Sequence, residues 1–96
     1  MYEFPKGFFW GSATSGYQVE GNNIYSDWWQ FMPSNNACKH YEFYKEDFDL
    51  AKTLNHNAHR FSIEWSRIEP KEDNFNEEEI RHYRDVVIAL RERNLE

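Results

Sequence analysis

The sequence predicts an α/β fold in which βα units place parallel strands side by side. Three observations support this: an apolar run at residues 8–13, an alternating run at residues 58–65, and helical periodicity after each run. A parallel sheet needs cover on both faces, and two strands cannot close a barrel. We therefore expect residues 1–96 to form two βα units of a larger sheet.

The first unit begins with residues 8–13 (FFWGSA), which are typical of a buried strand that runs into a turn. Residues 14–37 mix glycine and asparagine with large aromatic side chains, which predicts a long ordered loop with one or two helical turns near Trp28. Loops of this length inside a compact domain are usually functional.

A helix is predicted from about His40 to Leu54, because its apolar residues recur at spacings of three and four. These residues are Tyr41, Tyr44, Phe48 and Ala51. Asn55 and Asn57 both suit the left-handed conformation that ends a helix.

The second unit begins with residues 58–65 (AHRFSIEW), which alternate as a strand with one polar and one apolar face. The polar face holds Ala58, Arg60, Ser62 and Glu64, and the apolar face holds His59, Phe61, Ile63 and Trp65. Asn76 then predicts an N-cap, with Glu79 completing a capping box. Apolar spacing extends the last helix over about residues 77–94.

Composition excludes several classes of function. The net charge of −6 is spread along the chain, so nucleic acid is not an expected partner. The single cysteine, Cys38, rules out an internal disulfide framework and argues against a Cys-ligated zinc site. No apolar run approaches the roughly 20 residues of a membrane span, and the N-terminus lacks a signal-peptide core. We expect a soluble, cytoplasmic chain without membrane contact.

Aromatic residues make up 19% of the chain, although its mean hydropathy is −0.97. A domain of this size buries only some 60–65% of its unfolded surface, so it cannot easily hide so many rings. This predicts either a piece of a larger fold or an aromatic binding face.

Two polar residues are the principal candidates for function. Gln18 follows the first strand, at the strand end where βα proteins bind ligands, and its amide can donate to one sugar hydroxyl and accept from a neighbouring one. The alternative is a loop-capping role. Arg60 lies on the polar face of the second strand and would need a carboxylate partner if buried. That partner is either a catalytic carboxylate, whose pKa Arg60 would lower, or a structural one such as Glu64.

Other candidates carry less weight. Glu20 and Glu64 resemble a glycosidase acid–base pair, but seventeen acidic residues make such a pair easy to find by chance. The four histidines lack metal-ligand spacing, so no metal site is expected. Trp28 and Trp29 suit sugar stacking, but packing into a core is the commoner use of such a pair.

Two long motifs resemble glycoside hydrolase family 1, the β-glucosidase and β-galactosidase family. Residues 4–21 (FPKGFFWGSATSGYQVEG) resemble the family signature FPxxFxWGxATSAYQxEG, and residues 57–70 (NAHRFSIEWSRIEP) resemble NAYRFSIxWSRIxP. Between and after them, residues 44–47 (YKED) and 75–78 (FNEE) resemble two of the family's helix segments. The resemblance covers nearly all of residues 4–94 in the family's order.

The resemblance implies a (β/α)₈ barrel that hydrolyses terminal β-linked sugars with retention and uses no metal or organic cofactor. By position, Gln18 corresponds to the glutamine that binds two hydroxyls of the non-reducing sugar. Arg60 corresponds to the arginine that keeps the nucleophilic glutamate ionised. Glu64 falls on a variable position of the motif.

Several positions depart from the family pattern. Gly16 replaces the usual alanine, whereas Asn55 and Asp73 stand where glycine is usual and still tolerate the left-handed conformation. His59 replaces an aromatic residue, usually tyrosine, and is expected on the barrel exterior.

The family's NEP and ENG motifs, which carry its acid/base and nucleophilic glutamates, do not occur in the chain. Residues 1–96 are therefore interpreted as the N-terminal βαβα portion of one barrel domain, inactive alone and dependent on the remaining barrel polypeptide. The alternative is a non-catalytic carbohydrate-binding or structural fragment that self-associates.

Overall fold

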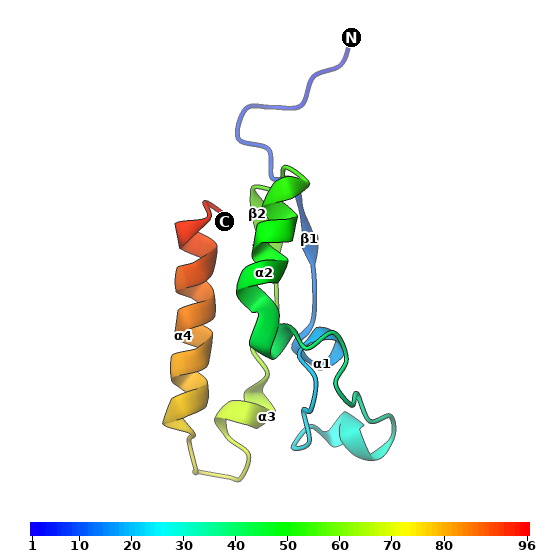
Figure 1. Ribbon diagram of the computed structural model, residues 1–96, viewed down its shortest axis with the longest axis vertical. Coiled ribbons are helices and arrows are strands. Elements are labelled where there is room, and N and C mark those ends of the chain that lie inside the picture. Colours follow the sequence, from blue (N-terminus) through cyan, green and yellow to red (C-terminus); the bar gives the residue numbers. More distant parts are fainter.

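The computed structural model describes residues 1–96 and contains a two-stranded parallel sheet with two long helices (Figure 1). The elements, in chain order, are β1 (Gly11–Ala13), α1 (Gly16–Val19), the 3₁₀ helix η1 (Asp27–Gln30), α2 (His40–Thr53), β2 (Ala58–Arg60), α3 (Trp65–Ile68) and α4 (Glu77–Glu92). None of these helices has the length and apolar character needed to cross a membrane.

The sheet pairs β1 with β2 in parallel, with Gly11 opposite Ala58 and Ala13 opposite Arg60. The other edge of β2 also carries backbone hydrogen bonds: the amide of Glu96 donates to the carbonyl of Asn57 (3.0 Å), and the amide of His59 donates to the carbonyl of Glu96 (2.8 Å). Glu96 thus bonds to the two residues on either side of Ala58, which is the hydrogen-bonding pattern of a parallel ladder. Glu96, four residues after the end of α4, therefore lies beside β2, where a third parallel strand would run.

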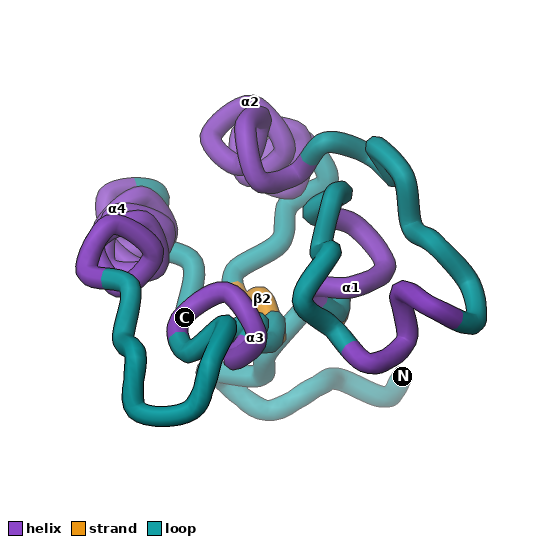
Figure 2. Tube along the Cα trace, turned by 90° about the horizontal axis from the view of Figure 1, so that it is seen from below, coloured by secondary structure: helices purple, strands orange, loops and turns teal.

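Both long helices pack on the same face of the sheet (Figure 2). The core lies between these helices and the strands, and it consists of Phe48, Val86, Ala89, Leu90 and Leu95, with Tyr44 and Phe61 packed against it. His59 points into this layer, where its ring packs 5.5 Å from that of Phe48. In a (β/α)₈ barrel the helices cover the exterior of the sheet. The position of His59 on the helix side therefore agrees with its predicted place on the barrel exterior.

The helix predictions are largely confirmed, because periodicity over fourteen or more residues is a strong signal. Asn55 and Asp73 both have positive φ angles, of 60° and 61°, as predicted. The side-chain oxygen of Asn76 accepts hydrogen bonds from the amides of Glu78 and Glu79, so Asn76 is the N-cap of α4. The capping box is wrong in its second half, since Glu79 instead accepts a hydrogen bond from the Tyr41 hydroxyl.

The second strand is shorter than predicted. It ends at Arg60, and the chain then turns into α3 at Trp65. The expected apolar face does not persist, because Ile63 and Trp65 are 49% and 58% exposed. Side chains interrupt the ladder: the Ser62 hydroxyl accepts a bond from the Gly16 amide (2.7 Å), and the Glu64 amide donates to the Tyr83 hydroxyl (3.1 Å).

Candidate functional site

The two predicted site residues lie at the carboxyl end of the sheet, Gln18 just after β1 and Arg60 at the end of β2. Gln18 belongs to α1, which starts three residues after β1, and its side chain is exposed and forms no hydrogen bond. Arg60 is the last residue of β2. Because strand residues alternate between faces and His59 faces the helices, Arg60 faces the opposite, open side of the sheet.

Arg60 forms no ion pair, and it is exposed rather than buried. A structural pair with Glu64, one of the two alternatives predicted, is wrong. The Glu64 carboxylate instead accepts a hydrogen bond from the Ser66 hydroxyl (2.8 Å). The guanidinium of Arg60 therefore remains available on the open face, where it can bind a carboxylate or another anion.

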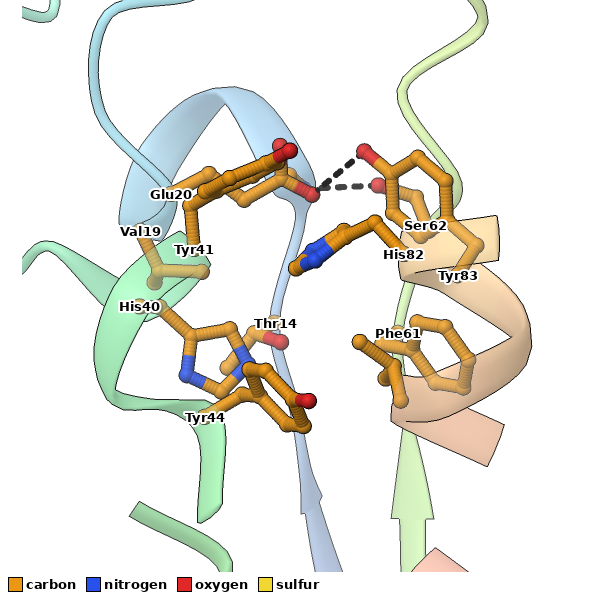
Figure 3. Close-up of a pocket in the computed structure, with 12 residues that line it drawn as sticks. Thr14, Val19, Glu20, His40, Tyr41, Tyr44, Phe61, Ser62, His82 and Tyr83 are labelled. Carbon is orange, nitrogen blue, oxygen red and sulfur yellow. Dashed lines mark hydrogen bonds between the residues drawn. The ribbon is translucent and has the colours of Figure 1, made fainter. Parts of the chain in front are cut away.

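The most connected polar cluster of the protein surrounds Glu20, which the sequence did not single out for this role. Both oxygens of this carboxylate are occupied: the Tyr83 hydroxyl donates to Oε1 (2.7 Å) and the Arg67 Nε donates to Oε2 (2.8 Å). Figure 3 shows Glu20 facing Tyr83 across the cavity between α1 and α4. Glu20 is 4% exposed, so it acts as a paired internal charge and the Glu20–Glu64 acid–base pair is not formed.

Charge around this cluster has clear consequences for protonation. Burial and the Glu20 carboxylate raise the pKa of the Tyr83 hydroxyl, which therefore stays protonated and serves as a hydrogen-bond donor. Burial and the hydrogen bond to Glu79 raise the pKa of Tyr41 to about 12. The Arg67 guanidinium also lies 4.3 Å from the centre of the Tyr41 ring, a cation–π contact.

The His82 ring contacts both Tyr41 and Tyr83, and it is held neutral. Its ring stacks on Tyr41 with centroids 3.8 Å apart. Burial and repulsion by the Arg67 charge lower the pKa of His82 from 6.5 to about 4. No group of histidine, cysteine and acidic side chains in the protein is arranged to hold a metal ion.

We expect stability to fall as the pH drops from about 6.5 towards 4. The unfolded His82 ring binds a proton near pH 6.5, whereas the folded ring resists protonation until about pH 4, so acid favours the unfolded state. The loss should be about 1–2 kcal/mol once solvent screening at this half-buried site is allowed for. Urea unfolding between pH 7.5 and 4.5 measures it.

His82→Phe keeps the aromatic stacking and should flatten this pH dependence, whereas His56→Gln should leave it intact. Burial also lowers the pKa of His59, so a smaller slope of the same sign should persist in the His82→Phe variant. An unchanged slope in His82→Phe would contradict the assignment.

Comparison with known proteins finds related sequences. The chain matches the family model for glycosyl hydrolase family 1 over residues 1–96. It is 35% identical to a 1,4-β-D-glucan glucohydrolase of Thermotoga neapolitana, an alignment that covers 99% of the chain and 26% of that protein. It is also 35% identical to β-glucosidase A of Thermotoga maritima, over 97% of the chain and 24% of the relative.

Solved structures agree with this relationship. The β-glycosidase from Pyrococcus horikoshii superposes with a TM-score of 0.90 at 43% identity, covering 96% of this chain and 23% of that one. The chain thus spans about a quarter of the length of the relatives that it matches. The predicted fold, the first two βα units of a (β/α)₈ barrel, is confirmed by these matches. The chain belongs to glycosyl hydrolase family 1.

Proposed function

We propose that this chain supplies the sugar-binding and nucleophile-supporting part of a retaining β-glycosidase acting on terminal β-glucoside or β-galactoside linkages. The observation that carries the proposal is the open face of the sheet. Arg60, at the end of β2, and Gln18, in α1, have no side-chain partner in the chain. The opposite face of the sheet is covered by α2 and α4.

The remaining barrel polypeptide would cover this face and bring both catalytic glutamates, whether it continues from this chain or is a separate one. The position of Glu96 beside β2 supports this arrangement, because its hydrogen bonds occupy the place of a third strand. Retaining hydrolysis needs one carboxylic acid to protonate the leaving oxygen and one carboxylate to attack the anomeric carbon. Water then cleaves the glycosyl intermediate with overall retention.

Arg60 would face the nucleophilic carboxylate once the barrel is complete. A guanidinium next to a carboxylate lowers the pKa of the carboxylate and keeps it ionised for attack. Gln18 would bind two neighbouring hydroxyls of the sugar, accepting from one through its carbonyl oxygen and donating to the other through its amide nitrogen.

A hybrid enzyme tests this function. Residues 1–96 would replace the matched segment of the Pyrococcus horikoshii β-glycosidase, and hydrolysis of a chromogenic β-glucoside would be measured. We expect Arg60→Met to lower kcat/KM about 100-fold or more, by loss of electrostatic support, and Gln18→Ala to lower it about 10–100-fold.

The chain offers matched controls for both substitutions. Arg84→Met removes an exposed arginine of α4, and Gln30→Ala removes an exposed glutamine of η1; both should retain activity. An inactive hybrid, or equal losses in the Arg60 and Arg84 variants, would refute the proposal. Hydrolysis by the 96-residue chain alone would refute the need for a complementing polypeptide, and sugar binding by that chain as a self-associated oligomer would favour a non-catalytic role.

A further inference from the structure

We propose that Glu20, Arg67 and Tyr83 form an ionic clamp that positions Gln18 for its contact with the sugar. The inference rests on the proposed function, because it assigns three positioning residues to the same site. None of the three would touch the substrate. Each would act through the backbone that carries Gln18.

The clamp joins three segments that are distant in sequence. Glu20 ends α1, Arg67 belongs to α3 and Tyr83 to α4. One carboxylate accepts a hydrogen bond from each partner, at 2.8 Å from Arg67 and 2.7 Å from Tyr83. The Glu20 and Tyr83 residues are each only 4% exposed, so neither bond competes with bulk water.

The clamp also holds the residue that follows Glu20. Arg67 donates a second hydrogen bond, from Nη2 to the carbonyl oxygen of Gly21. Gly21 has a φ of +90°, and a side chain at this position would collide with the carbonyl of Asn36 at 2.3 Å. The chain therefore leaves α1 along one fixed path. Arg67 binds two successive residues on it, Glu20 through the carboxylate and Gly21 through the carbonyl oxygen.

Helix α1 needs this external support because it is only four residues long. A helix of one turn gains too few hydrogen bonds to offset the cost of nucleation. Its N-cap, Ser15, makes no side-chain capping bond, but the amide of Gly16 donates to the Ser62 hydroxyl at 2.7 Å. The helix is thus held from outside at both ends, by Ser62 at its start and by the clamp at its finish.

Gln18 lies between these two attachments. Its backbone amide donates to Ser15 and the amide of Glu20 donates to Gly16, so a shift of Glu20 is transmitted to the turn that carries Gln18. Its side chain remains exposed and without a hydrogen bond. A fixed backbone holds the unpaired side-chain amide of Gln18 in one place, where it can bind hydroxyls at a defined position. Small displacements of a substrate-binding group weaken catalysis.

A double-mutant cycle distinguishes positioning from simple stabilisation. Tyr83→Phe removes the hydrogen bond to Glu20, together with the one that the hydroxyl accepts from the Glu64 amide, and keeps the aromatic ring. In the hybrid enzyme described above, we expect it to lower kcat/KM about 5–30-fold. In a Gln18→Ala background the same substitution should change kcat/KM less than twofold, because the residue through which it acts is missing. Val86→Ala, one turn along α4 in the core, should lower stability without changing kcat/KM at 25 °C.

Hydrogen exchange gives an independent readout in the same proteins. Tyr83→Phe should accelerate exchange of the Val19 and Glu20 amides about tenfold, whereas Val86→Ala should leave these two amides close to the wild-type rate. Equal Tyr83→Phe losses with and without the Gln18→Ala substitution would overturn the inference, as would Val19 and Glu20 exchange that is no faster in Tyr83→Phe than in Val86→Ala. If Gln18→Ala alone leaves kcat/KM unchanged, it is the sugar-binding role of Gln18 that fails.

Discussion

Replacing Arg67 with methionine is expected to lower the free energy of unfolding by about 3–5 kcal/mol. Methionine fills a similar volume but leaves the Glu20 carboxylate charged, with its side chain only 5% exposed and without the Nε donor at 2.8 Å. The substitution also removes the bond to the Gly21 carbonyl and the cation–π contact with Tyr41. Urea unfolding at pH 7.5 measures the loss.

The double variant Glu20→Gln, Arg67→Met separates the cost of an unpaired charge from that of lost packing. Glutamine is neutral, and its carbonyl oxygen can still accept the Tyr83 hydrogen bond. We therefore expect the double variant to recover about half of the stability that Arg67→Met loses. If the double variant is less stable than Arg67→Met, burial of the Glu20 charge is not the cause of the loss.

Phe48→Ala is expected to cost about 3–5 kcal/mol, because it empties the centre of the core between α2 and the sheet. Phe48 is 1% exposed, and its ring packs edge-on against His40 at 5.4 Å and lies 5.5 Å from His59. The contact with His59 joins α2 to β2, so its loss loosens the layer against which the strands rest.

Leu50→Ala provides the control on the same helix. Leu50 is 62% exposed, and its truncation should change the free energy of unfolding by no more than about 0.5 kcal/mol. A loss below about 1 kcal/mol for Phe48→Ala, or equal losses for the two variants, would show that the core does not lie where α2 meets the sheet.

Local signals in the sequence were sufficient for the two long helices, α2 and α4, but not for the single-turn helices α1 and α3. The spacing of apolar residues predicted α2 to within one residue, and α4 ends two residues earlier than expected. Asn76 could be predicted as an N-cap because the amides that it bonds, those of Glu78 and Glu79, lie only two and three residues further along the chain. Glu79 was harder to assign, because its partner, Tyr41, lies 38 residues away.

The strand boundaries depended on tertiary contacts that alternation cannot reveal. Residues 61–64 have strand-like alternation, but Ser62 and Glu64 bond to Gly16 and Tyr83 and leave the ladder. Arg60 was expected to have a partner because an unpaired charge cannot be buried. Arg60 instead lies exposed on the open face, where its charge stays hydrated and needs no partner within the chain.

Gln18 and Arg60 were selected from their places relative to the predicted strands, and the motifs agreed, but the contacts of Glu20 could not be predicted. Glu20 was considered only as one half of an acid–base pair. Its actual partners, Arg67 and Tyr83, are 47 and 63 residues distant, and no spacing rule connects them. The ion pair between Glu20 and Arg67 depends on tertiary structure, because it forms only when β1 and β2 pair in parallel and place α1 beside α3.

The most direct test of the central claim is a crystal structure of the hybrid β-glycosidase that contains residues 1–96, with a glucose-derived inhibitor bound. We expect the Gln18 amide to lie within about 3.2 Å of two adjacent sugar hydroxyls, and the Arg60 guanidinium to bond a carboxylate from outside residues 1–96. A sugar bound elsewhere, or Arg60 turned towards solvent away from the sugar, would contradict the assignment of this face of the sheet as the substrate site.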